Sequence, residues 1–148
     1  MRASSDEIRS AIGLVQLGKL AEANRRRAEI TRSYRGRLRG VDLVGVAFEA
    51  NSGVTAAHIL PLLANDSATR QALVGALADA SVQTSHHYPP VHLFSHYRER
   101  FGYSEGMLPK TELFAACEVT LPLYPSMQEG DLEYVANVVR GAVQGVAR

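Results

Sequence analysis

The feature that most limits how this chain can fold is a long amphipathic stretch near its N-terminus. Its apolar residues recur at near-helical spacing, at Ile8, Ile12, Val15, Leu20, Ala23, Ile30, Tyr34 and Leu38. The pattern predicts one helix over residues 5–39, with Ser4 or Ser5 as its cap and Gly40 as its stop. Such a helix is about 50 Å long at about 1.5 Å per residue. Because a small domain does not need that length, we expect the helix to lean on a larger domain or a second subunit.

Short apolar runs follow the long helix. Val41–Phe48 and Val54–Leu63 flank the turn signal Asn51–Ser52–Gly53, which predicts a β-hairpin. Asp66 is the expected N-cap of a helix over residues 67–80. The remaining expected elements are a brief strand at Val82–Thr84, a short helix near 92–101, a helix over 109–118, an extended segment at Leu121–Leu123 and a final helix from about 128 to 146.

The final helix is expected to begin at a Ser126 cap and to bury one apolar face, formed by Leu132, Val135, Val138, Val139 and Val143. We find no repeat, linker or low-complexity stretch, so residues 1–148 are expected to form a single domain. The order of elements predicts an α+β fold, in which a small, mostly antiparallel sheet is flanked by helices and preceded by the long one.

Composition excludes several classes of protein. Hydrophobic residues make up 46% of the chain and charged residues 21%, which is enough for a core and unlike a disordered chain. Residues 1–40 hold ten Lys/Arg against four Asp/Glu. Their arginine stripe is typical of a solvated helix face or of a face that meets an acidic surface, and the absence of interleaved aromatic residues argues against nucleic acid. The lone Cys117 is expected in the core, and the lack of a signal peptide or spanning apolar run favours a cytoplasmic protein without membrane contact.

Residues 85–110 form the segment richest in chemically active side chains, including four of the five histidines. One interpretation is a metal site, because His92 and His96 are four apart and His87 is nearby. A Ser/His/Asp hydrolase is a second interpretation, although the chain has no G-x-S-x-G motif. A third is that these histidines only pack and hydrogen-bond to backbone. The last is a binding loop for a polar, anionic ligand, stiffened by Pro89 and Pro90.

Segments along nearly the whole chain together resemble the DegT/StrS family of sugar aminotransferases. The family patterns are "NYR…EI.AAIGL.QL.KL", "RR", "HLF", "R..L…L", "T..HY.P.H", "LP.TE…LPLYP" and "D...V". In the same order, they resemble Arg2–Leu20, Arg26–Arg27, Ala57–Leu60, the helix from Arg70, Thr84–His92, Leu108–Glu112 with Leu121–Pro125, and Asp131 with Val135.

The resemblance implies an enzyme family that uses pyridoxal 5′-phosphate to move an amino group, usually from glutamate, onto a nucleotide-linked keto-sugar in polysaccharide or antibiotic sugar biosynthesis. It implies the small C-terminal domain of an aspartate-aminotransferase-like fold, in homodimers with active sites at the subunit interface. Thr84, His87, Tyr88 and His92 are then substrate-binding residues, and Arg2 lies near the cofactor phosphate. No catalytic residue and no metal ligand is carried over.

The resemblance also implies that the large domain, with the lysine that forms a Schiff base with the cofactor, is missing from these 148 residues. Lys19 and Lys110 are the only lysines, and neither matches a catalytic motif. We therefore expect a split subunit or an inactive remnant, with an exposed apolar patch where the large domain docks. The partner would be a separately encoded large domain or a second copy. The alternative is a non-catalytic binding or assembly module whose surface has become polar.

Overall fold

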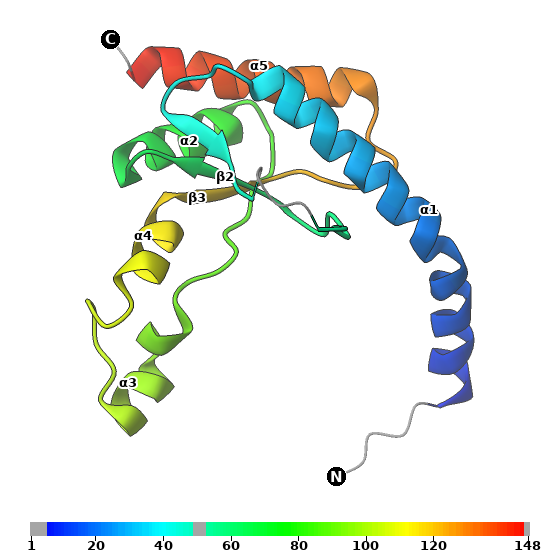
Figure 1. The fold of residues 1–148 in the computed structure, drawn as a ribbon, viewed down its shortest axis with the longest axis horizontal. Coiled ribbons are helices and arrows are strands. Elements are labelled where there is room, and N and C mark those ends of the chain that lie inside the picture. The colour runs from blue at the N-terminus through cyan, green and yellow to red at the C-terminus, as the bar shows by residue number, and fades with distance from the viewer. Residues whose placement is uncertain (1–5, 49–52, 147–148) are drawn as a thin grey trace.

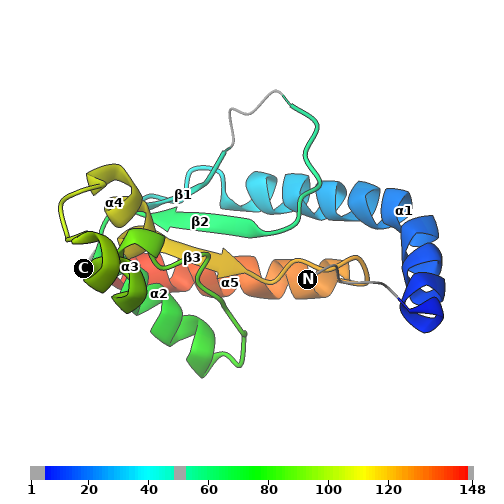
Figure 2. The ribbon, with the colours of Figure 1, turned by 90° about the horizontal axis from the view of Figure 1, so that it is seen from below.

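The structure is a computed structural model that describes residues 6–48 and 53–146. Helix α1 spans Glu7–Leu38 and bends, so that its N-terminal part extends beyond the rest of the fold (Figures 1 and 2). Asp6 caps it by accepting a hydrogen bond from the Arg9 backbone N–H at 2.8 Å. The expected caps Ser4 and Ser5 lie outside the described residues. Gly40, in the left-handed conformation at φ 73°, follows the helix as expected.

The sheet is small and antiparallel throughout, in the order β1-β2-β3. The predicted hairpin is confirmed by the pairing of β1 (Val44–Val46) with β2 (Leu60–Ala64), and β2 pairs in turn with β3 (Glu118–Leu121). The second strand starts later than predicted. A local turn precedes it, where the Ala57 N–H donates to Thr55 Oγ1 and Ala57 has a φ of 45°. Most of the predicted turn lies outside the described residues.

Strands β2 and β3 have two different faces. Since side chains alternate along a strand, Leu62 and Val119 share one face, and this face belongs to the hydrophobic core. The pairs Pro61↔Thr120 and Leu63↔Glu118 share the opposite face. All four residues of β3 are buried, so Glu118 and Thr120 place polar groups on a covered surface.

The core lies between the sheet and three helices. Helix α2 (Ser67–Asp79) is capped by Asp66 as predicted, and both α2 and α1 contact α5 (Glu129–Val146). The predicted inward face of α5 is confirmed, with Val138 only half-buried. The larger core side chains from these helices and strands are Ile30, Tyr34, Leu60, Leu62, Leu73, Leu77, Val119, Leu121, Met127, Leu132 and Val139.

The segment between the core helices and β3 carries shorter elements. They are a 3₁₀ turn at Val91–Leu93, α3 (Ser95–Phe101) and α4 (Pro109–Cys117). Figure 1 shows α3 and α4 on the side of the molecule away from α1. Cys117, at the end of α4, is buried as predicted. Together these elements confirm the α+β fold class.

Two predicted extended segments differ from the structure. Val82–Thr84 is not a strand, because the Val82 N–H bonds back to the Leu77 carbonyl at the end of α2, and the segment first meets the sheet at the isolated bridge Ser85↔Thr120. The segment predicted at Leu121–Leu123 is instead the strand Glu118–Leu121. Pro122 has no N–H to donate to a ladder, which explains why the strand stops before it.

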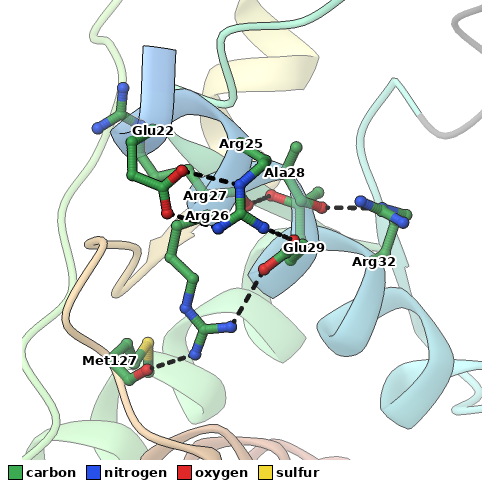
Figure 3. Close-up of polar contacts among 9 residues, drawn as sticks. Glu22, Arg25, Arg26, Arg27, Ala28, Glu29, Arg32 and Met127 are labelled. Atoms are coloured by element: carbon green, nitrogen blue, oxygen red, sulfur yellow. Dashed lines mark hydrogen bonds and ion pairs between the residues drawn. The ribbon is translucent and has the colours of Figure 1, made fainter. Parts of the chain in front are cut away.

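The arginine stripe of α1 makes contacts within the chain itself (Figure 3). Arg25 pairs with Glu22 and Glu29 on its own helix. Arg26 donates to the Met127 carbonyl at 3.0 Å, which ties α1 to the segment before α5. Arg37 pairs with Glu129 at the start of α5, so that the stripe combines exposed arginines with arginines that hold α1 on the fold. In the part of the chain that the structure describes, no helix is long and apolar enough to cross a membrane.

Candidate functional site

A groove of about 540 Å³ lies where the loop after α2, the end of β3 and the start of α5 meet. That volume is within the range of small-molecule sites, roughly 300–1,000 Å³. Its polar lining side chains are His58, Ser81, Gln83, Thr84, Ser85, His87, Thr120, Tyr124, Asp131 and Tyr134. They come from segments far apart in the sequence, which the bridge between Ser85 and Thr120 brings together.

The groove wall is firmly supported from behind. Met127 is buried, and its carbonyl accepts the hydrogen bond from Arg26. The hydroxyl of Tyr34 lies 3.8 Å from Met127 Sδ, and burial raises the pKa of this phenol. On the other side, the Tyr134 hydroxyl donates to the Ala80 carbonyl at 3.0 Å. These contacts tie the segments that line the groove to the core helices behind them.

His87 is the most constrained of the predicted site residues. Its Nδ1 lies 2.8 Å from Thr120 Oγ1, and its backbone N–H donates to Glu118 Oε2 at 2.9 Å. The Thr120 hydroxyl in turn donates to Glu118 Oε1. Glu118 is fully buried (0% exposed). The Thr120 hydroxyl therefore contacts the imidazole directly, and the Glu118 carboxylate holds both that hydroxyl and the His87 backbone N–H.

The other predicted substrate-binding residues are only partly gathered at the groove. Thr84 lines it, as His87 does. Tyr88 is 64% exposed and packs edge-to-face on the His87 ring, with the ring centroids 4.6 Å apart, outside the lining. His92 is buried at 6% exposure and also lies outside the lining. Arg2 lies outside the described residues.

The contacts of His92 are those of a structural anchor. Its Nε2 lies 2.9 Å from Glu112 Oε1, and the same carboxylate accepts the backbone N–H groups of Gly106 and Leu108. The Gly106 N–H, followed by the His92 imidazole, holds the pKa of Glu112 below its ordinary value. The pair joins the 3₁₀ turn to the start of α4. Within residues 6–48 and 53–146, no group of three or more histidine, cysteine, aspartate or glutamate side chains is placed to hold a metal ion.

The charge of the groove differs from what an anionic ligand needs. Among the described residues that line it there is no lysine or arginine, and Asp131 is the one carboxylate. Its Oδ2 accepts the Gln128 backbone N–H at 2.9 Å at the start of α5. Hydroxyl, amide and imidazole groups beside tyrosine rings suit the hydroxyl groups of a neutral ligand better than a phosphate.

Sequence reasoning missed Glu118, Thr120 and the tyrosines of the groove. A signal for the first two is present, because Glu118–Val119–Thr120–Leu121 alternates polar and apolar residues as a strand with two distinct faces does. Tyr124 follows β3 and Tyr134 lies on α5, and neither position is marked locally as facing a groove, because the groove forms only where these segments meet the loop after α2.

Comparisons with known proteins agree with this fold. SpsC, a spore coat polysaccharide biosynthesis protein of Bacillus subtilis, is 32% identical over 143 residues, which cover 94% of this chain and 37% of SpsC. The aminotransferase TlmJ of Streptoalloteichus hindustanus superimposes with a TM-score of 0.88 at 32% identity, covering 100% of this chain and 39% of TlmJ. DesI, solved in the presence of its TDP-sugar product, matches with a TM-score of 0.81 at 26% identity over 93% of this chain and 36% of DesI.

The chain thus spans well under half the length of these relatives. Residues 3–140 match one family in sequence, and the members of that family are pyridoxal-phosphate-dependent enzymes. This match covers most of the chain. The chain therefore belongs to the DegT/DnrJ/EryC1/StrS aminotransferase family.

Proposed function

We propose that this chain is the small, substrate-orienting domain of a pyridoxal-phosphate-dependent aminotransferase that acts on nucleotide-linked keto-sugars with glutamate as amino donor. In this proposal residues 1–148 are one domain, and the cofactor-binding domain lies outside them. The observation that carries the proposal is the groove, which offers hydroxyl, amide and imidazole groups to a polar ligand on a domain of this family. DesI, a relative of the same fold, has a TDP-sugar as its product.

The residues present do not fit pyridoxal 5′-phosphate. Such enzymes hold the cofactor through a lysine and need an acid beside the pyridine nitrogen. The sequence has two lysines, Lys19 in the exposed half of α1 and Lys110 in the first turn of α4, and neither lines the groove. We therefore assign no chemical step to this chain alone. The role proposed for it is to bind and orient the sugar.

Within this role, Thr84 and His87 would contact the sugar hydroxyls directly. Tyr88 would act from the rim, where its exposed ring supports His87. His92 would act indirectly, through its tie to Glu112 that fixes the end of the same loop. Because no lysine or arginine is found among the described residues that line the groove, the charged diphosphate and nucleotide would lie outside it.

The exposed N-terminal half of α1 is consistent with a partner domain that lies outside residues 1–148. Residues 6–22 are all exposed, and the large apolar side chains among them are Ile8, Ile12, Leu14, Val15, Leu17 and Leu20. Several large apolar side chains exposed on one half helix indicate an interaction site, and a module that had lost its partner would instead gain from a polar surface. We propose that this half helix packs on the cofactor-binding domain, and that the assembled enzyme is a homodimer.

Binding of a sugar nucleotide tests the proposal directly. TDP-glucose would be titrated into the 148-residue chain by calorimetry, and His87→Asn and Thr84→Val should each weaken binding. His96→Asn is the matched control, because His96 is exposed and does not line the groove. Equal affinity in all four proteins would refute the groove assignment. No binding at all would favour the assembly module.

A second test concerns catalysis by the chain alone. The chain would be mixed with pyridoxal 5′-phosphate, reduced with borohydride and examined by mass spectrometry, and assayed for amino transfer from glutamate to a TDP-linked keto-sugar. We expect neither a specific adduct at Lys19 or Lys110 nor any transfer. Transfer by the isolated chain would contradict the proposal that the cofactor lysine comes from elsewhere.

A further inference from the structure

His87, Thr120 and Glu118 are joined by hydrogen bonds, and the contact between Thr120 and the His87 ring needs a proton that the threonine cannot supply. The imidazole itself must then supply it. Thr120 has a single hydroxyl proton, which it donates to Glu118 Oε1. A hydroxyl that donates its only proton can act toward a second partner only as an acceptor. Thr120 Oγ1 also lies 2.8 Å from His87 Nδ1. A hydrogen bond between those two atoms therefore requires that Nδ1 carry a proton.

The carboxylate that starts this chain of bonds is placed to act only as an acceptor. Its Oε2 receives the His87 backbone N–H at 2.9 Å, and its Oε1 receives the Thr120 hydroxyl. Buried charged groups persist where such hydrogen bonds satisfy them. Glu118 is held from the other side as well, because Arg70 Nε donates to its backbone carbonyl at 2.9 Å. Glu118 is thus held by contacts from its own strand, from the loop that carries His87 and from α2.

We propose that Glu118 and Thr120 are positioning residues that fix His87 in the Nδ1–H tautomer. In the neutral ring this leaves Nε2 as the unprotonated nitrogen and hence a hydrogen-bond acceptor. Within the described part of the chain, no protein group is hydrogen-bonded to Nε2. His87 lines the groove, so Nε2 is available to accept a hydrogen bond from a ligand hydroxyl. That last assignment rests on the proposed sugar-binding function, whereas the tautomer does not.

The fixed tautomer also gives the groove a defined polarity. An imidazole with its proton on Nε2 would donate to a ligand oxygen, whereas one with its proton on Nδ1 accepts from a ligand hydroxyl or amino group. Ser85 does not change this assignment, because its hydroxyl lies 3.4 Å from the same Nδ1 and can accept from the same N–H. The strand that carries Glu118 and Thr120 thereby sets which group of a ligand His87 recognises.

The test is to measure the His87 tautomer by nuclear magnetic resonance. Long-range proton–nitrogen spectra of the ¹⁵N-labelled 148-residue chain, without ligand at neutral pH, separate protonated from unprotonated ring nitrogens. His87→Asn identifies the His87 signals among the five histidines by removing them. We expect Nδ1 in the protonated region and Nε2 in the unprotonated region. A protonated Nε2 with an unprotonated Nδ1 would overturn the proposal, because it would place the missing proton on Glu118.

Glu118→Gln gives a sharper test, because the same contacts predict a reversal. The glutamine oxygen must still accept the His87 backbone N–H, so its NH₂ group faces Thr120 and donates to Oγ1. The threonine proton is then left to donate to His87 Nδ1, and the ring changes to the Nε2–H tautomer. If Glu118→Gln leaves the proton on Nδ1, the hydrogen bonds from Glu118 through Thr120 do not set the His87 tautomer, and the proposal is wrong.

Three further variants separate positioning from folding. Thr120→Ser keeps the hydroxyl and should preserve the Nδ1–H form, whereas Thr120→Val removes it and should release the ring toward the Nε2–H form that free histidine prefers. Glu112→Gln alters a half-buried carboxylate that contacts a different histidine, His92, and should leave the His87 signals unchanged. A shift of the His87 tautomer in Glu112→Gln equal to that in Glu118→Gln would mean that the effect is a general change of fold, and would overturn the proposal.

Addition of TDP-glucose distinguishes this inference from the proposed function. A change in the His87 Nε2 shift on titration supports both. If the free chain shows the Nδ1–H tautomer and TDP-glucose leaves Nε2 unmoved, positioning by Glu118 and Thr120 stands and the sugar-binding role of His87 fails.

Discussion

Substitution of two glycines in helix α1 tests whether the exposed half of this helix depends on a partner. Gly13 and Gly18 lie in the half where every residue from 6 to 22 is exposed. A Cβ built at either position meets no atom within 4 Å. Alanine therefore fits both sites without strain. In the isolated chain this half helix gains nothing from burial, so its stability depends on local propensity, and isolated helices of about 12–15 residues are marginal in water.

The expected magnitude follows from helix propensity. Glycine in a helix interior is less favourable than alanine by about 0.8–1.0 kcal/mol. Two substitutions therefore shift the local helix–coil equilibrium by about 2 kcal/mol, which corresponds to roughly 25-fold. Global stability should rise far less, because local opening of this half helix does not require the core to unfold.

Hydrogen exchange measures this local equilibrium. We expect fast exchange of the amides of residues 10–20 in the unmodified chain and clear slowing in the double variant Gly13→Ala/Gly18→Ala. Gly36→Ala is the matched control, because Gly36 is an exposed residue of the same helix with no atom within 4 Å of an added Cβ, but it lies in the half that packs on the core. The reasoning is refuted if the amides of residues 10–20 are already strongly protected in the unmodified chain, since that half would then be stable without a partner.

Three further predictions concern the core and the caps. Leu77→Ala, at a fully buried position of α2, should lower the free energy of unfolding by about 2–5 kcal/mol in urea titrations, whereas the exposed Leu113→Ala should change it by less than about 0.5 kcal/mol. The lowered pKa of Glu112 stabilises the fold above the ordinary value of about 4.3, and this contribution disappears as the pH falls through the lowered value. Thermal melts of Glu112→Gln should therefore lose part of the acid dependence below about pH 5, and a melt curve parallel to the unmodified chain would contradict this. Asp66→Ala should lower the melting temperature more than Asp66→Asn, because asparagine can still accept the Thr69 N–H at the start of α2, and equal losses would refute the cap.

The helices could be predicted well because their signals are local. Asp66 caps α2 as the sequence predicts, and the apolar face of α5 is the predicted one. At the other end of the chain Ile8, Ile12 and Val15 continue the helical spacing, yet they are exposed rather than packed on this domain. Periodicity shows that an apolar face exists, and only the tertiary structure shows what covers it.

The strands were harder to place because their limits depend on partners far along the chain. Leu60–Ala64 begins where β3 is available to pair, although the apolar run in the sequence starts earlier, at Val54. Val82 is a β-branched residue of the kind favoured in strands, yet its N–H donates to the Leu77 carbonyl at the end of α2. Strand propensity describes a half-buried pleated surface rather than an intrinsic backbone preference, and so it cannot resolve such competition.

The candidate site was predicted in part for the same reason. The motif around His87 marks the right loop, but sequence alone cannot tell that His92, in the same motif, is buried and paired with Glu112 while Thr84 faces the groove. His92 contacts the Glu112 carboxylate directly, and His87 is linked to the Glu118 carboxylate through Thr120. Of the two histidines, only His87 also lines the groove. Burial therefore divides the motif into a residue that contacts the groove and one that holds the loop.

The polar face of β3 gives a physical reason why binding and chemistry would be divided between two domains. A buried carboxylate and threonine can orient an imidazole only if the strand that carries them is rigid, and β3 is rigid because its other face, Val119 and Leu121, is part of the core. A cofactor-binding lysine beside the same groove would place a cation within reach of Asp131 and compete with the hydrogen bonds that fix the start of α5. If that lysine lies on another domain, as proposed, the groove keeps a lining without lysine or arginine among the described residues, so that it would distinguish sugars by the position of their hydroxyl groups.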